Sequence, residues 1–391
     1  MTLIEGLDSV QTSKIEALFE LGSRMNDTIN LSIGEPDAEV PEVLKEAAAR
    51  HIRNGRNKYG PLRGIPQLRE RVAARYAERG LDVRAENVSI TMGAQNAIFA
   101  GLASILRRGD EVIVFSPAFP TYAAVATILG ARVRFVRTSP NNDFAPDPET
   151  LRSAITRSTR VIVINSPSNP TGAVYGRRLM REVIDAASNV DAYVLSDEVY
   201  EEFVYDGEFV SAAEFMDLYH RILLVNSFSK TLAITGWRLG YLVAPDELSE
   251  RIGKVLLYGH TCPPTFAQYA VLDVMDSDEV REFVRRCRDE YRRRRDAAVR
   301  ALNGSGIETP RPRGSLYVFP RLPAGVDDNE FCFSLLEKEN VIVVPGSTFG
   351  PGGEGHLRMS ITSPVQLIEE GAKRIRRFLE DYVGSRGGRV P

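Results

Sequence analysis

Residues 221–231 read RILLVNSFSKT, an apolar run that ends in two serines and a lysine. A continuous apolar run of this length is typical of a strand that is buried on both faces of a sheet. Six further strand candidates occupy the middle of the chain, and helical stretches such as residues 95–106 and 177–187 lie between them. They cover residues 87–91, 111–116, 132–137, 160–165, 192–196 and 239–244. This alternation predicts an α/β fold with a mainly parallel seven-stranded sheet covered by helices.

The rest of the chain predicts a second, smaller domain. Too little chain separates residues 221–226 from residues 239–244 for a parallel crossover, so we expect the last strand to run antiparallel. A long charged helix over residues 278–302 follows, and Gly- and Pro-bearing turns end it. Shorter strand and helix candidates then alternate to the end of the chain. We therefore expect a large domain over residues 45–285 and a small α+β domain built from residues 1–44 and 286–391.

Composition narrows the classes of protein to consider. The chain has 391 residues, 43% of them hydrophobic, and a net charge of −3, which favours neither nucleic acid nor a membrane as the main partner. Its three cysteines, Cys262, Cys287 and Cys332, are far apart and form no metal or disulfide pattern. The first ten residues do not resemble a targeting segment. We expect a cytoplasmic protein, and the spacing of the four histidines predicts no metal site.

Polar residues follow three of the predicted strands. Lys230 follows residues 221–226, Asp197 ends the run AYVLSD, and Asn169 lies in the turn after RVIVIN. In open α/β sheets, ligands bind beyond the carboxyl ends of the strands, so these side chains are expected at one edge. Each has an ordinary explanation when taken alone: a surface lysine, a solvated strand end and a turn residue before Pro170. A lysine in this place can also form a Schiff base if burial favours its neutral amine.

The three local sequences are informative in combination. They are NPTG at residues 169–172, SDEVY at residues 196–200 and SFSKTLAITGWRLGY at residues 227–241. In this order and spacing the chain resembles the fold-type I enzymes that use pyridoxal 5′-phosphate (PLP), and within them the aspartate-aminotransferase-like class I/II aminotransferases. The resemblance runs from about residue 30 to the C-terminal helix. It implies a fold-type I PLP-transferase that moves an amino group from an L-amino acid to a 2-oxo acid in a ping-pong reaction.

The resemblance also implies how the cofactor ring is held. Lys230 would carry PLP as a Schiff base and then move the proton at the substrate Cα. Asp197 would pair with the pyridine nitrogen, while Asn169 and Tyr200 would bond the 3′ oxygen. Phe119 would stack on the ring, as offset aromatic pairs do. Lys230, Asp197 and Tyr200 are the residues expected to be catalytic.

The phosphate group would lie at the start of the helix after residues 87–91. Gly93, Ala94 and Gln95 form this start, and a helix N-terminus binds anions. Two further phosphate ligands, Ser227 and Arg238, lie in the motif around Lys230, and Tyr59 would reach the phosphate of the neighbouring subunit. The resemblance therefore implies a homodimer with shared active sites.

The substrate would be recognised chiefly through its α-carboxylate. Arg358 matches the arginine that clamps this group, and a planar guanidinium suits two parallel hydrogen bonds to a carboxylate. Gly34 would close its backbone over the same carboxylate, and Asn169 would also contact the substrate. Residues 10, 11 and 15 are expected to border the substrate side chain, whose identity the sequence leaves open.

Three classes of function share these cofactor motifs. The first is an aminotransferase; the second is a PLP-dependent lyase, decarboxylase or cyclising enzyme on the same scaffold; the third is a non-catalytic PLP-binding regulator. The chain has no room before Asn30 for a DNA-binding domain, and an intact Lys230 argues against a regulator. The arginine-rich residues 285–302 suggest a nucleic-acid site, but the interleaved acidic residues favour a solvated helix face.

Overall fold

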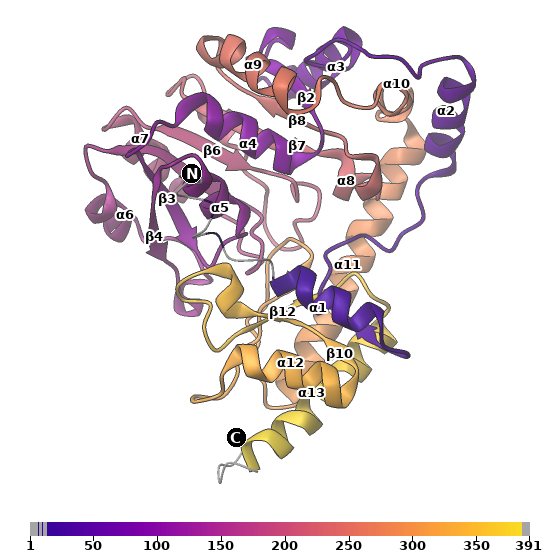
Figure 1. Ribbon diagram of the computed structural model, residues 1–391, viewed down its shortest axis with the longest axis vertical. Coiled ribbons are helices and arrows are strands. Elements are labelled where there is room, and N and C mark those ends of the chain that lie inside the picture. Colours follow the sequence, from indigo (N-terminus) through magenta and orange to yellow (C-terminus); the bar gives the residue numbers. More distant parts are fainter. Residues whose placement is uncertain (1–6, 8–9, 11–13, 385–391) are drawn as a thin grey trace, which may run out of the picture.

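The computed structural model describes residues 7, 10 and 14–384, and its core is a seven-stranded sheet (Figure 1). The strand order is β2-β8-β7-β6-β5-β3-β4. The strands are β2 (Val88–Thr91), β3 (Glu111–Ser116), β4 (Arg132–Arg137), β5 (Thr159–Asn165), β6 (Tyr193–Asp197), β7 (Ile222–Ser227) and β8 (Gly240–Val243). β8 is antiparallel to both of its neighbours, and the other pairings are parallel. The predicted sheet and its reversed last strand are both confirmed.

Helices cover both faces of this sheet, which is why most of its strands are continuously apolar. Val112 and Val114 of β3 pack with α4 (Ala94–Ile105), α5 (Thr121–Ile128) and α9 (Ser249–His260) on one face. Ile113 and Phe115 point to the other face, which α6 (Pro148–Ala154) and α7 (Arg177–Ser188) cover. β4 is one of the two edge strands, and of its residues only Val136 is buried. The flanking helices of the large body are α2 (Glu42–Arg53), α3 (Pro66–Ala77), α8 (Phe228–Thr231) and α10 (Thr265–Val274).

A second body lies below the sheet in Figure 1 and contains residues 14–30 together with the C-terminal part of the chain. β1 (Ile29–Asn30) pairs in parallel with β10 (Val341–Ile342), and β12 (Leu357–Ser360) lies between β11 (Val344–Pro345) and β9 (Tyr317–Val318). The helices of this body are α1 (Lys14–Ser23), α12 (Asp328–Glu339) and α13 (Val365–Gly384). Pairing through β1 ties the N-terminal segment to the C-terminal part of the chain.

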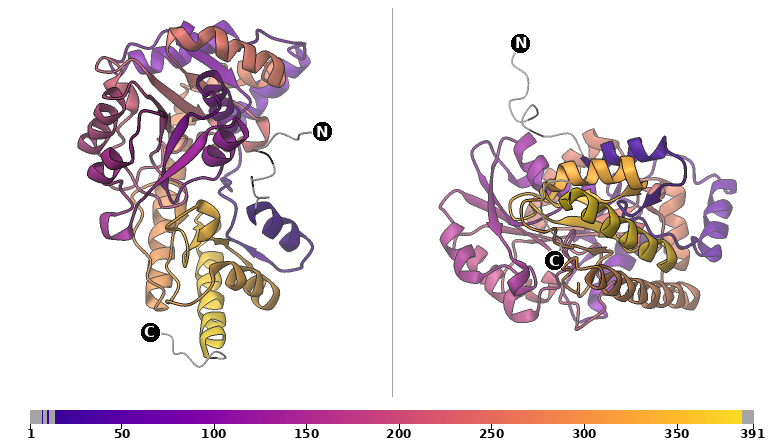
Figure 2. Two further views of the ribbon diagram at one scale, coloured as in Figure 1. Left: turned by 60° about the vertical axis from the view of Figure 1, so that its left-hand side comes forward. Right: turned by 90° about the horizontal axis from the view of Figure 1, so that it is seen from below.

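The two bodies are connected by one long helix, α11 (Asp278–Gly304). It runs from the neighbourhood of α8 and α10 down to the lower body, where it packs along α13 (Figures 1 and 2). The helix is continuous across residues 285–286, where the sequence analysis places a domain boundary, and the exact division into domains stays a prediction.

The interpretation of the arginine-rich part of α11 as a solvated face is wrong for two residues. Arg281, Arg285 and Arg293 are exposed and pair with acidic residues of the same helix, as expected. Arg294 is only 8% exposed and Arg295 is fully buried. Both pair with acidic residues on other segments of the chain, Asp37 and Asp206, so the pattern of alternating charge hid two buried arginines.

Among the described residues, no helix is long and apolar enough to cross a bilayer, and no group of three or more His, Cys, Asp or Glu side chains is arranged to hold a metal ion.

Candidate active site

A cavity of about 290 Å³ opens at the carboxyl edge of the sheet. Strands β2, β3, β5, β6 and β7 end at this edge, and β8 begins there because it runs the opposite way. Topology therefore brings together side chains that are far apart in sequence. Twelve of the residues singled out in the sequence line the cavity: Ile15, Gly34, Ala94, Gln95, Phe119, Asn169, Asp197, Tyr200, Ser227, Lys230, Arg238 and Arg358.

Lys230 lies on α8, the short helix that follows β7 directly. Its Nζ donates a hydrogen bond to the backbone oxygen of Gly34 at 2.7 Å. Burial lowers the pKa of Lys230, because a charged ammonium loses solvation in this cavity. A lysine with a lowered pKa offers the neutral amine that a nucleophile and general base require.

Asp197 is a buried carboxyl group at the end of β6. Burial raises its pKa to about 6, while hydrogen bonds from the Tyr122 hydroxyl (2.7 Å) and the Val199 amide (3.2 Å) act in the opposite direction. No cation within the described part of the chain forms an ion pair with it. A buried carboxylate prepared by hydrogen bonds fits the protonated nitrogen of a pyridine ring.

Tyr200 and Tyr317 form a pair of buried hydroxyls in the same cavity, 3.1 Å apart. Burial, followed by the neighbouring Tyr317, raises the pKa of Tyr200 well above its usual value, so its hydroxyl stays protonated as a donor. Tyr317 also explains Gly34, since a Cβ there would lie 1.8 Å from the Tyr317 hydroxyl oxygen. The glycine lets the N-terminal segment approach the site closely.

Arg358 is a fully interior arginine on β12. Its Nη1 donates to the Asn169 side-chain oxygen at 3.2 Å, and its Nη2 donates to the Ser32 backbone oxygen. Its Nε is buried and has no hydrogen-bond partner among the described residues. The guanidinium lies 4.5 Å from the centre of the Tyr317 ring, which helps to fix its plane. This arrangement fits the recognition of a carboxylate.

The start of α4 provides an anion site beside these groups. Its N-cap, Gly93, makes no side-chain cap hydrogen bond, and the cavity is lined by the next two residues, Ala94 and Gln95. Gly93 has φ 79°, and a Cβ there would lie 2.6 Å from Nη2 of Arg238. Arg238 is oriented by the backbone oxygens of Thr235 (2.8 Å) and Met92 (3.3 Å). A guanidinium packed on a helix N-terminus is suited to a phosphate group.

The remaining predicted residues are placed as follows. Ser227 caps α8, and its hydroxyl bonds the Ser229 amide, within the cavity wall. Tyr59 is 87% exposed and does not line the cavity of its own chain. Ile15 lines the cavity, whereas Val10 does not, and Gln11 lies outside the described residues.

Sequence reasoning missed three residues that organise this site. Tyr122 donates to Asp197, Tyr317 contacts Tyr200, and Asn165 bonds both the Asp197 backbone oxygen (3.1 Å) and the Asn169 amide (2.8 Å). A signal existed for Tyr122, which stands three residues after Phe119 at the start of a helical stretch. For Tyr317 the decisive fact is the pairing of β9 with β12, which local sequence does not encode.

Comparison with known proteins agrees with this geometry. The model of the family "Aminotransferase class I and II" matches residues 26–375. The chain is 37% identical to an aspartate aminotransferase of Pyrococcus abyssi, over 97% of this chain and 99% of the relative. It is 38% identical to aromatic-amino-acid aminotransferase 2 of Thermococcus litoralis, over 97% and 99%. The chain belongs to the class I and II aminotransferases.

The fold comparison leads to the same family. The structure of the Thermus thermophilus aspartate aminotransferase with maleate superposes with a TM-score of 0.92, at 36% identity, over 97% of this chain and all of that one. The chain is thus a fold-type I, PLP-dependent aminotransferase, and the lyase and regulator alternatives are set aside. The buried lysine, the buried carboxylate without a cation and the helix-end anion site fit PLP.

Proposed function

We propose that this aminotransferase works through Lys230, Asp197, Asn169, Tyr200 and Arg358, with the phosphate of PLP held by α4 and Arg238. The observation that carries this proposal is their convergence on one cavity from separate strands. PLP supplies an electron sink for the charge that develops at the substrate Cα. The protein supplies orientation, proton movement and charge balance.

Each side chain has a step that its surroundings suit. Arg358 and the Gly34 backbone hold the α-carboxylate, and this places the Cα–H bond within reach of Lys230. The neutral amine of Lys230 would take the proton from the substrate Cα, and the same amine, once protonated, would be the group that returns it. Asp197 would pair with the ring nitrogen of bound PLP and hold it protonated, and the hydroxyl of Tyr200, supported by Tyr317, would donate to the 3′ oxygen.

Replacing Lys230 with Ala tests this assignment. We expect turnover to fall below detection while PLP still binds through Asp197 and the phosphate site. The measurement is the conversion of L-amino acid to 2-oxo acid, together with the absorbance of bound cofactor. Normal turnover in this variant would overturn the assignment.

For the amino donor we propose an L-amino acid with an apolar or aromatic side chain. Among the described residues, the cations that line the cavity are Lys230, Arg238 and Arg358, and each already has a role. Ile15 and Ile33 line the wall beyond them. The relatives named above include both aspartate and aromatic aminotransferases, so a panel of donors against 2-oxoglutarate and pyruvate decides. A kcat/KM for aspartate about tenfold above that for phenylalanine would contradict the proposal and point to a cation from another subunit.

We further propose that the chain works as a homodimer. Large hydrophobic side chains are exposed on adjoining elements: Phe99 on α4, Leu257 and Tyr258 on α9, and Tyr59 in the loop that Thr265 bonds at the Lys58 backbone oxygen. Exposed apolar side chains grouped in this way favour a protein interface.

The three free cysteines support a reducing compartment, and we propose the cytoplasm.

A further inference from the structure

The segment of residues 31–37 forms one wall of the cavity and contacts two of its cations. The Gly34 backbone oxygen accepts from Lys230 at 2.7 Å, and the Ser32 backbone oxygen accepts from Arg358. The side chain of Ile33 lines the same cavity. The position of this backbone therefore sets the space left for a substrate carboxylate.

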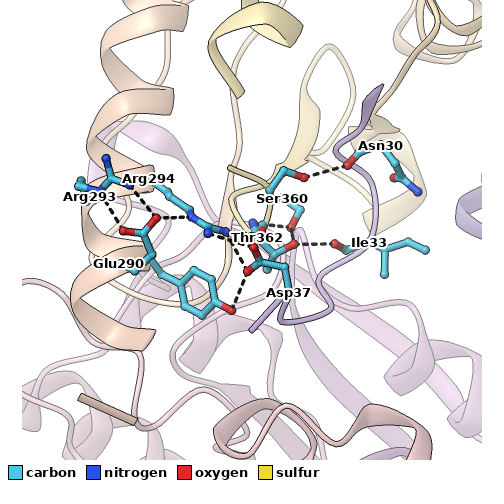
Figure 3. Close-up of polar contacts among 10 residues, drawn as sticks. Asn30, Ile33, Asp37, Glu290, Arg293, Arg294, Ser360 and Thr362 are labelled. Carbon is cyan, nitrogen blue, oxygen red and sulfur yellow. Dashed lines mark hydrogen bonds and ion pairs between the residues drawn. The ribbon is translucent and has the colours of Figure 1, made fainter. Parts of the chain in front are cut away.

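The segment is also held by an ion pair that does not line the cavity, between the buried Arg294 and the exposed carboxylate of Asp37 (Figure 3). Arg294 of α11 donates from Nη1 and Nη2 to the two carboxylate oxygens of Asp37, at 2.9 and 3.0 Å. The hydroxyl of Tyr291 lies 3.4 Å from the same carboxylate. Thr362, just after β12, donates from its hydroxyl to the Ile33 backbone oxygen at 3.2 Å. The segment is thus bound to the connecting helix and to the strand that carries Arg358.

Hydrogen bonds other than those to Asp37 also hold the Arg294 side chain in place. Its Nε donates to Glu290 at 2.8 Å, its Nη1 also donates to the Thr362 backbone oxygen, and the side chain is almost fully buried. A buried guanidinium must have partners on all sides, and its planar fork specifies one orientation of the carboxylate it binds. Such a group transmits the position of α11 to residues 31–37.

We propose that the Arg294–Asp37 pair positions residues 31–37 so that the Gly34 backbone closes on the substrate α-carboxylate beside Arg358. Arg294 is then a positioning residue for substrate binding, and it acts through a segment that contacts the substrate. The inference rests on the role proposed above for Arg358. It predicts a larger effect on the binding of carboxylates than on the chemical step, because Asp197 keeps its hydrogen bonds from Tyr122 and Val199, and Lys230 stays anchored on α8 directly after β7.

The experiment uses the PLP-loaded enzyme and 3-phenylpropionate, a carboxylate that lacks the amino group and cannot react. Arg294→Met should weaken its binding about tenfold and raise KM for the amino donor more than it lowers kcat. Arg294→Lys should recover part of this loss, because an ammonium can meet Asp37 but not as a planar fork. Arg293→Ala is the matched control. Arg293 donates to the same Glu290, but it is exposed and forms no hydrogen bond with residues 31–37. The affinity of this variant for 3-phenylpropionate should therefore equal that of wild type.

A second variant guards against misfolding of Arg294→Met. Asp37→Asn leaves Arg294 its bonds to Glu290 and Thr362, and should also weaken 3-phenylpropionate binding. If Arg294→Met and Asp37→Asn lower the melting temperature but leave the dissociation constant and KM as in wild type, the pair is merely structural and the proposal is overturned. Arg358→Ala separates the two hypotheses. If Arg358→Ala does not weaken the binding of 3-phenylpropionate, the proposed role of Arg358 is wrong, and this inference, which rests on it, is wrong too. If Arg358→Ala weakens binding but the Arg294 and Asp37 variants do not, only the inference is wrong.

Discussion

At the scale of single residues, the site brings together ionisable side chains whose charged forms are disfavoured by burial. Asp197 is the clearest case, because its carboxyl is buried and, among the described residues, only two hydrogen bonds support its charge. Its pKa of about 6 lies above that of an aspartate in an unfolded chain, about 4. Protonation of Asp197 therefore stabilises the folded protein when no cofactor is bound. This contribution to the free energy of unfolding is fully present below about pH 4 and is lost as the pH rises through about 6.

Asp197→Asn should stabilise the cofactor-free protein at neutral pH. Asparagine carries no charge to desolvate, so the free energy of unfolding at pH 8 should exceed that of wild type by about 3 kcal/mol, with the difference disappearing below about pH 4. Urea unfolding across this pH range measures it. Asp217→Asn, at an exposed carboxyl, is the control and should change little. An equal effect of Asp197→Asn at all pH values would contradict the pKa assigned to Asp197.

Tyr317→Phe tests the second residue that the sequence did not reveal. Phenylalanine keeps the ring beside Arg358 but removes the hydroxyl that contacts Tyr200. Since that hydroxyl strengthens Tyr200 as a donor to the 3′ oxygen, its loss should raise the midpoint of the pH titration of the lysine-bound cofactor by about one unit. Absorbance titration measures the midpoint. A midpoint equal to that of wild type would show that Tyr317 only packs against Tyr200.

At the scale of elements, the strand pattern carried most of the fold. Apolar runs, most of them continuous, predicted all seven strands of the sheet, and the short connection before β8 predicted its reversal. The reversal matters for the site, because β8 begins at the edge where its neighbours end and so brings Arg238 there. The burial of Arg294 and Arg295 could not be predicted in the same way, because their partners are distant in sequence and α11 alone resembles an exposed charged helix.

Gly93→Ala tests the junction of β2 and α4. The backbone at Gly93, with φ 79° and ψ 173°, lies in a region that only glycine adopts easily, and a Cβ would displace Arg238. We expect a loss of about 1–3 kcal/mol in the free energy of unfolding and weaker binding of PLP. Gly176→Ala, at the N-cap of α7 with negative φ and open space around it, is the matched control. Unchanged PLP affinity in Gly93→Ala would remove this helix end from the phosphate site.

At the scale of the whole molecule, the described chain contains every predicted cofactor residue in its own cavity except Tyr59, and Gly93, which packs on Arg238 just behind the wall. Tyr59 is exposed, as is Tyr258 on α9. The role of Tyr59 in binding PLP was predicted from the family resemblance alone. The sequence of one chain does not say to which subunit's active site a residue contributes. A dimer with shared sites predicts a specific behaviour of mixed subunits.

Tyr59→Ala alone should lose about 10- to 100-fold in activity, the value of a hydrogen bond to a charged group, and Lys230→Ala should be inactive. If Tyr59 serves the neighbouring subunit, a dimer of one chain of each kind has one site with both residues intact. Random reassociation of equal amounts makes about half of the dimers mixed, so about a quarter of all sites are restored. Activity of the mixture should therefore rise to about a quarter of wild type.

Lys230→Ala mixed with Arg238→Ala is the control, because both residues line one chain's cavity and no site is restored. If native mass spectrometry shows exchanged dimers and the first mixture gains no activity, Tyr59 does not complete the neighbouring site.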